Sequence, residues 1–425
     1  MSSSPDADPL NSDRYAPDGA YAFWRLGLSL LIATLAGAGM WAVIVVLPKA
    51  QLEFGVDRAA ASVPYTLTML GFAFGTIALG RAVDRVGIAL PLLISGVCLG
   101  AGFAIAGIAP NLAVFSAAHL LVIGVGAGGG FAPMMADISH WFVRRRGLAV
   151  VVVASGNYAA GALWPLIMNW TMPLIGWRGT YLAIGIFVAT IVIGASFFMR
   201  RRPSASVIAE ADHATRAASA ASGISLRLLT ALLIVAGFSC CAAMSMPQVH
   251  IVAYCGDLGY GATRGAQMLS LMLALGVVSR IGSGVVADAI GGTATLLIGS
   301  LMQGVALLLY LYFDGLTSLF VVSGVFGLFQ GGIVPMYAVI CRELMPPREA
   351  GARIGLVVSS TIFGMAFGGY FSGVIFDLTN SYRAAFLNGV FWNGVNLLVV
   401  GGLFWRQQRL LRARSATLQG AARPG

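Results

Sequence analysis

One charged side chain stands inside a long apolar segment. Arg280 is the only Asp, Glu, Lys or Arg within the twelve apolar stretches of the chain. A guanidinium at the centre of a bilayer costs roughly 3 kcal/mol, and its planar fork can hold a carboxylate through two hydrogen bonds. The sequence therefore predicts an anion site at Arg280. The alternative is an arginine held by backbone carbonyls or by an acid from another segment.

The position of Arg280 along its stretch places it deep in a membrane. It lies eight residues before Asp288, or about 12 Å along a helix, which is close to the midplane. Polar side chains of other stretches could line the same site, or could tie helices together by polar contacts. These candidates are Asn157, Tyr158, Tyr65 and Tyr337.

Further candidates lie toward the ends of the stretches. Lys49, the only lysine, follows a proline at the end of the first stretch, where it could attract an anion or extend to the interface. Gln248 is its counterpart in the second half and could also contact an anion. His119 and His250 could titrate between pH 5 and 8 and carry coupling protons, or could be neutral packing residues.

The composition indicates a membrane protein. Of 425 residues, 58% are hydrophobic and 10% are charged, whereas soluble domains carry about 25% charged residues. A membrane span needs about 20 apolar residues. Twelve stretches qualify: 26–47, 61–80, 88–109, 112–136, 148–170, 179–199, 228–248, 266–287, 293–313, 316–340, 354–376 and 384–405.

The connections divide the chain into two halves. Most are short, but residues 200–227 form a long linker rich in Ala, Ser and Arg. We expect six-helix bundles at 26–199 and 228–405, with tails at 1–25 and 406–425. Of the 26 basic residues, 20 fall on the side of the termini and 4 on the other side. The positive-inside rule therefore predicts that both termini are cytoplasmic.

The net charge of +10 could suggest a nucleic-acid partner, but it falls in short clusters between apolar stretches, as topology signals do. The five cysteines lack the spacing of metal ligands, and no phosphate-binding loop or nucleophile with a nearby base is found. We therefore expect no nucleic-acid partner, no metal or other cofactor, and no enzymatic activity.

An internal repeat relates the two halves. Its members recur after 204 residues: Gly80, Asp84 and Gly87 correspond to Gly284, Asp288 and Gly291. Pro133 also recurs, 202 residues later, as Pro335. A parallel duplication of six helices is typical of transporters.

The loop after the second stretch resembles the signature loop of the major facilitator superfamily. It reads Gly80-Arg81-Ala82-Val83-Asp84-Arg85-Val86-Gly87. The resemblance implies an all-α membrane fold of twelve helices in two pseudo-symmetric six-helix bundles. It also implies that Gly80, Arg81, Asp84, Arg85 and Gly87, with Asp288, form a latch at the inner gate. The alternative is that these charged residues form a tight turn and only orient the chain in the membrane.

Two more segments carry a pattern. Residues 18–24 hold an acidic residue, a glycine and aromatic residues, and residues 141–149 hold two aromatic residues, three arginines and Leu-Ala. Both segments resemble motifs of the monocarboxylate transporter branch of this superfamily. The resemblance implies that Arg280 and Lys49 bind substrate. Several members of the branch have an Asp one turn before the arginine, where this chain has Gly276, so the coupling mechanism stays open.

The sequence as a whole predicts a secondary active transporter of small organic anions. We expect monocarboxylates such as lactate or pyruvate, proton coupling, and alternating access around Arg280. The alternatives are an exchanger or exporter of another organic anion, aromatic acid or drug and, more remotely, a membrane enzyme or receptor. We expect the protein to be a monomer. We also expect it in a bacterial inner membrane, because the excess of Arg over Lys suggests a GC-rich bacterial gene.

Overall fold

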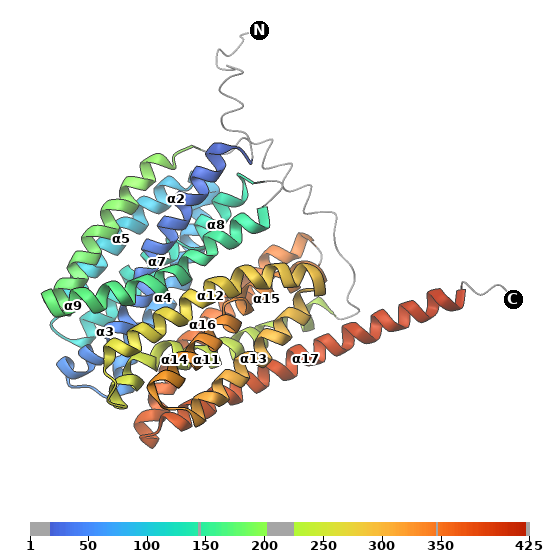
Figure 1. Cartoon of the computed structure of the whole chain (residues 1–425). Coiled ribbons are helices and arrows are strands. Elements are labelled where there is room, and N and C mark those ends of the chain that lie inside the picture. The colour runs from blue at the N-terminus through green and yellow to red at the C-terminus, as the bar shows by residue number, and fades with distance from the viewer. Residues whose placement is uncertain (1–17, 143–145, 202–224, 346, 422–425) are drawn as a thin grey trace, which may run out of the picture.

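The chain folds into long helices. The computed structural model describes residues 18–142, 146–201, 225–345 and 347–421, and these ranges contain helices and connecting turns but no strand (Figure 1). Most of the predicted tail 1–25 and linker 200–227 lies outside them, as do residues 143–145 of the predicted branch motif.

The described residues of the first half form five membrane-length helical segments, and two of these segments are divided by a break. Gly37 separates the two parts of the first span, and a π-helical turn followed by a break divides the fourth. The elements are α2 (Ala20–Ala36), α3 (Ala38–Phe54), α4 (Arg58–Val86), α5 (Ala89–Gly107), α6 (Leu112–Ala118), η1 (His119–Gly124), α7 (Val125–Gly129), α8 (Ala132–Ser139) and α9 (Arg146–Phe198).

The second half has the same order of spans, but its first span is one unbroken helix and its last two spans are separate helices. Its elements are α11 (Leu226–Asp257), α12 (Ala262–Ile290), α13 (Gly292–Tyr312), α14 (Leu316–Gln330), α15 (Ile333–Leu344), α16 (Pro347–Thr379) and α17 (Tyr382–Ala421). The last helix continues beyond position 405, where the apolar stretch ends, and projects from the bundle (Figure 1).

These elements make twelve membrane spans. The described residues hold 11 helical segments long and apolar enough to cross a membrane, and one of them runs over 51 residues from Leu148 to Phe198. A helix of that length would measure about 75 Å, more than twice the hydrocarbon thickness. It bends at Gly176, whose φ of 71° and ψ of 170° are not helical, so it supplies two spans. The predicted fold class is confirmed.

The fourth and tenth spans are interrupted at corresponding places. One breaks between α7 and α8 at Gly130 and Phe131, and the other between α14 and α15 at Gly331 and Gly332. A proline follows each break, and proline has no N–H to bond to the carbonyl four residues earlier. Pro335 therefore leaves the carbonyl of Gly331 without a helical partner.

The two halves meet along two helix pairs. In Figure 1 the blue and green helices of the first half lie beside the yellow and orange helices of the second, with α4 against α16 and α9 against α12. Glycines allow the approach because a side chain would not fit. A Cβ at Gly369 would lie 2.9 Å from the ring of Tyr65, and one at Gly373 would lie 3.1 Å from the Cα of Ala59.

A buried ion pair fixes one end of the first half. Arg25 of α2 donates from Nε and Nη2 to the two carboxylate oxygens of Asp137 of α8, each at 2.7 Å. The guanidinium also donates to the Tyr21 hydroxyl at 3.1 Å and lies 4.8 Å from the centre of the Trp141 ring. The first predicted stretch begins at residue 26 and the fourth ends at residue 136. Arg25 and Asp137 therefore each fell one residue outside a predicted span.

We predict that Asp137→Asn strongly destabilises the protein. The substitution leaves the Arg25 guanidinium buried without its counter-ion, which costs about 3–5 kcal/mol. Thermal unfolding in detergent should show a large fall in the unfolding temperature. Glu53→Gln is the matched control, because its partner Arg178 is 33% exposed at the side chain and such pairs contribute less than about 1 kcal/mol. Equal falls for the two variants would contradict the assignment.

Candidate functional site

The side chain of Arg280 is buried between the two halves. It is 4% exposed, and its Nε donates to the carbonyl of Gly331 at 3.1 Å. Its Nη1 donates to the carbonyl of Ala154, in α9 of the other half, at 2.8 Å. The Gly331 carbonyl is available because Pro335 cannot bond to it. Arg280 thus joins α12 to the break in the tenth span and to the first half.

The charge of Arg280 is not neutralised by a carboxylate within the described ranges. The ion pairs found there join other residues: Arg25 to Asp137, Arg58 to Asp257, and Arg178 to Glu53. The guanidinium carbon of Arg280 lies 4.2 Å from the ring centre of Tyr158, an attractive cation–π arrangement. The two carbonyl contacts are those of the structural alternative, an arginine held by backbone carbonyls, and they leave its positive charge without a carboxylate counter-ion in the described ranges.

Tyr158 also explains the glycine one turn before Arg280. A Cβ at Gly276 would lie 2.6 Å from Cε1 of the Tyr158 ring, so an Asp could not stand there without displacing the ring. On its other side, the Tyr158 hydroxyl lies 4.0 Å from the Met244 sulfur of α11. Tyr158 of the first half therefore inserts between α11 and α12 of the second.

Three other predicted residues lie away from the guanidinium contacts. Asn157 accepts a hydrogen bond from the Trp41 indole at 2.8 Å, within the first half. Tyr337 is buried and donates to Asn396 at 2.8 Å, which joins α15 to α17. Lys49 is exposed on α3. For Asn157 and Tyr337 the contacts favour the helix-tying alternative.

Tyr65 and Gln248 are fully buried polar residues. The Tyr65 hydroxyl has no hydrogen-bond partner among the described residues. The Gln248 amide nitrogen donates to Oε1 of Gln330 at 2.7 Å. The sequence pattern did not single out Gln330, although a glutamine inside the apolar stretch 316–340 was a usable signal.

Both predicted proton carriers are buried in packing contacts. Nδ1 of His119 lies 2.9 Å from the carbonyl of Phe115, and Nε2 lies 3.4 Å from the Tyr181 hydroxyl, all within the first half. Nε2 of His250 lies 2.8 Å from the carbonyl of Gly369, which joins α11 to α16. These contacts favour the packing alternative for both histidines.

Three charged residues of the predicted latch are exposed. They are Arg81 and Arg85 on α4 and Asp288 on α12, and no hydrogen bond or ion pair of theirs is found among the described residues. A Cβ at Gly80 or at its repeat partner Gly284 would meet no atom within 4 Å. The Asp84 side chain lies outside the described part of the chain, so the latch stays a prediction.

The turns that carry the latch motif do share one geometry in the two halves. Gly87 has a φ of 79° and Gly291 a φ of 85°, both in the left-handed region that favours glycine. These positive φ values give a physical reason for the glycines that recur 204 residues apart.

The opposite end of α4, here called the Arg58 end, bonds the two halves together. The Asp377 carboxylate of α16 accepts from the backbone N–H of Arg58 at 3.0 Å and of Ala59 at 2.6 Å. The Arg58 side chain forms a 2.9 Å ion pair with Asp257 of α11, which also accepts from the Tyr382 hydroxyl at 2.6 Å. An anion at a helix N-terminus is stabilised by the helix dipole. In the sequence, Arg58 counted only as one of the four basic residues on the side of the membrane opposite the termini.

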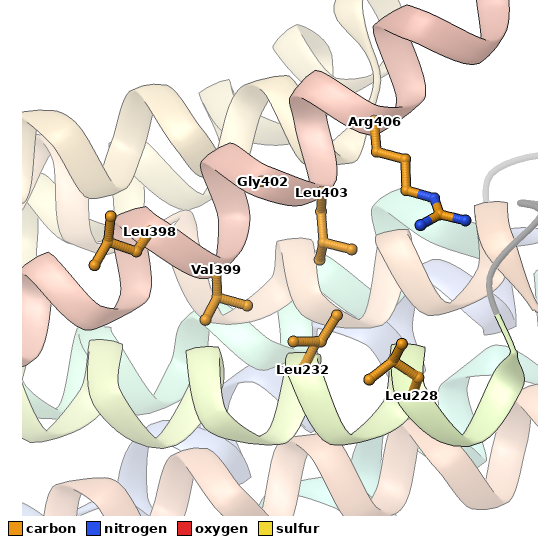
Figure 2. A pocket seen from close by; sticks show the side chains of 7 residues that line it. All are labelled: Leu228, Leu232, Leu398, Val399, Gly402, Leu403 and Arg406. Atoms are coloured by element: carbon orange, nitrogen blue, oxygen red, sulfur yellow. The ribbon is translucent and has the colours of Figure 1, made fainter.

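A surface cavity elsewhere does not belong to the predicted site. It has a volume of about 340 Å³ and lies between α11 and α17 (Figure 2). Its lining consists of Leu228, Leu232, Leu398, Val399, Gly402, Leu403 and Arg406. Since this lining includes neither Arg280 nor any other predicted site residue, the cavity carries no argument about the anion.

Comparison with known proteins decides the family. A family model described as Major Facilitator Superfamily matches residues 29–322 and again residues 283–422. The chain belongs to the major facilitator superfamily. It is a multi-pass membrane transporter rather than an enzyme.

Individual relatives agree with the predicted resemblance to the monocarboxylate branch. Monocarboxylate transporter 13 of Bos taurus is 26% identical over 388 residues, which cover 87% of this chain and 86% of the relative. Monocarboxylate transporter 4 of Gallus gallus is 23% identical over 405 residues, covering 88% and 80%. A bacterial relative, the uncharacterized MFS-type transporter YcxA of Bacillus subtilis, is 23% identical over 343 residues, covering 79% and 83%.

We predict that Asp377→Ala loosens the contact at the Arg58 end, because two hydrogen bonds to a charged acceptor are lost. Spin labels at Leu52 of α3 and Leu378 of α16, which are 85% and 79% exposed, report the separation of the halves there. Cys98, the one cysteine that is not buried, is first replaced by alanine. Pulsed electron paramagnetic resonance should show a new population at longer distance.

Asp314→Ala is the control for this measurement. Asp314 lies between α13 and α14, and no bond of its side chain is found among the described residues. The label distance should stay unchanged in this variant. An unchanged distance in Asp377→Ala as well would show that the carboxylate does not hold the halves together.

Proposed function

We propose that this protein is a secondary active transporter of small monocarboxylates. The observation that carries the proposal is Arg280, a buried cation held by carbonyls of both halves and paired with no carboxylate in the described ranges. A substrate carboxylate would supply the missing counter-charge through charge-assisted hydrogen bonds. The names of the relatives from Bos taurus and Gallus gallus support the same substrate class.

Arg280 is the one buried arginine without a carboxylate partner in the described ranges, which favours a single negative charge on the substrate. A dicarboxylate would carry a second charge into the site, and burying an unpaired charge is costly. Lys49 is exposed on α3, five residues before the helix ends, and would attract the anion before it reaches Arg280. In this proposal Lys49 attracts the carboxylate and Arg280 binds it.

The mechanism we propose is alternating access. Residues 26–199 would rock against residues 228–405 around Arg280, with the linker 200–227 joining them at the cytoplasmic side and with tails at 1–25 and 406–425. A carboxylate that takes over donors of Arg280 would weaken its bond to the Ala154 carbonyl, one of the contacts between the halves. Substrate binding would in this way change the strength of the contact that rocking must break.

Proton symport is the coupling we propose, because one proton moved with one monocarboxylate is electroneutral. Gly276 leaves no acid one turn before Arg280, so a titratable group elsewhere in the protein would carry the proton while the substrate carboxylate stays paired with Arg280. We place the protein as a monomer in a bacterial plasma membrane with both termini cytoplasmic. The arginine distribution and the Bacillus subtilis relative support this location.

We predict that Arg280→Ala lowers uptake of lactate, pyruvate or acetate into proteoliposomes at least about 10-fold, since a hydrogen bond to a charged group contributes about 1.5–3 kcal/mol. Arg280→Lys should retain part of the activity, because it keeps the charge and loses the fork. Arg264→Ala is the control. It removes an exposed cation of the same helix and should transport like wild type.

The proton gradient separates the coupling modes in the same assay. An inward gradient should accelerate uptake by wild type if the transporter is a symporter. Uptake that responds only to a trapped counter-anion would indicate an exchanger instead. If wild type moves none of these acids, or if Arg280→Ala transports as well as wild type, the proposed function is wrong.

A further inference from the structure

Two buried amides contact each other within the second half. Gln248 of α11 and Gln330, the last residue of α14, are both 0% exposed, and one hydrogen bond of 2.7 Å joins them. Oε1 of Gln248 and Nε2 of Gln330 have no partner among the described residues. The oxygen and nitrogen of an amide are hard to tell apart. If they were exchanged in both glutamines, one carbonyl oxygen and one amide nitrogen would still lack a partner.

Two other buried amides of the same half have both of their amide groups engaged, whereas Oδ1 of the buried Asn393 also has no partner among the described residues. Gln303 donates to the carbonyl of Cys240 at 3.2 Å and accepts from its thiol at 3.7 Å. Asn396 accepts from Tyr337 and donates to the hydroxyl of Ser300, each at 2.8 Å. Buried polar groups in proteins are nearly always hydrogen-bonded, so the incomplete bonding of the glutamine pair asks for a further partner.

The pair lies beside the groups that hold Arg280. Gln330 directly precedes Gly331, whose carbonyl accepts from Arg280. On α11, Met244 contacts the Tyr158 hydroxyl and lies one helical turn, about 6 Å, before Gln248. A small molecule bound to Arg280 by its carboxylate could therefore reach the amide pair with its other end.

A third buried polar atom without a partner comes from the first half. The Tyr65 hydroxyl is unpaired, and the Tyr65 ring packs against Gly369. The carbonyl of Gly369 bonds to His250, two residues after Gln248 on α11. An unsatisfied polar residue of the first half thus packs against Gly369, which contacts α11 two residues beyond Gln248.

We infer that Gln248 and Gln330 form a hydroxyl subsite, so that the substrate is a hydroxylated monocarboxylate. This inference rests on the proposed function of Arg280. A hydroxyl donates one hydrogen bond and accepts others, which matches the free carbonyl of one glutamine and the free amide nitrogen of the other. A keto oxygen could only accept, and an alkyl chain would leave both amide groups unpaired and desolvated.

The test compares acids that differ by one hydroxyl. Uptake of radiolabelled 3-hydroxybutyrate and butyrate, and of lactate and propionate, is measured in proteoliposomes with wild-type protein. We expect the hydroxy acid to be preferred at least about 10-fold in one or both pairs, since leaving buried polar groups unpaired is costly. In the double variant Gln248→Leu, Gln330→Leu the preference should fall to about 1 through loss of hydroxy-acid uptake.

Gln303→Leu is the matched control, because it removes a buried amide of the same half whose bonds are complete. It should keep the wild-type preference whatever it does to expression. The rise in unfolding temperature of the purified protein on adding each acid gives a second readout that needs no transport. It should be larger for the hydroxy acid in wild type and equal for both acids in the double variant.

The outcomes separate the two proposals. If wild type transports both members of each pair equally and Arg280→Ala abolishes both, the hydroxyl subsite is wrong and the monocarboxylate function stands. A double variant that keeps the preference also overturns the subsite. If wild type transports none of the four acids and none of them stabilises it, both proposals fall together.

Discussion

A guanidinium cannot stay in the interior of a membrane protein without acceptors for its N–H groups, and the arrangement around Arg280 follows from that constraint. The carbonyl of Gly331 is free because Pro335, four residues later, has no N–H, and the break between α14 and α15 exposes it at this depth. The Ala154 carbonyl comes from the other half, and Tyr158 offers its ring face. The local chain irregularity and the contact between halves thus serve the same cation.

The other buried arginines obey the constraint differently. Arg25 and Arg58 each pair with a carboxylate, at 2.7 and 2.9 Å, although Nε and Nη1 of Arg58 have no hydrogen-bond partner among the described residues. Carboxylate pairing gives a charge-neutral structural contact, whereas the carbonyl and ring contacts of Arg280 leave one positive charge between the halves. At the Arg58 end the halves are bonded together, and at the other end of α4 the side chains of Arg81 and Arg85 are exposed. The proposed alternating access would need the bonds at the Arg58 end to break when that side opens.

The fold could be predicted because apolar stretches and repeated glycines recur along the sequence. Arg280 could be predicted because a charged residue stands out in an apolar stretch. Twelve apolar stretches and glycines that recur after 204 residues defined the spans and the repeat, and Arg280 was visible as a charge among apolar residues. The pair of Arg25 and Asp137 was missed because span boundaries drawn from hydropathy are uncertain by a few residues. The bonds of Asp377 and the pairing of Gln248 with Gln330 depend on which helices become neighbours, and no local pattern contains that information. The close contact of Tyr158 with Gly276 likewise explains a departure from the branch pattern only once two helices are in place.

The most direct test of the central role of Arg280 is an experimental structure of the protein with a transported monocarboxylate bound. We expect the carboxylate oxygens within hydrogen-bond distance of the Arg280 guanidinium, with the bond to the Ala154 carbonyl lengthened or lost. A carboxylate bound elsewhere, with Arg280 still on the carbonyls of Ala154 and Gly331, would show that this arginine is a structural cation.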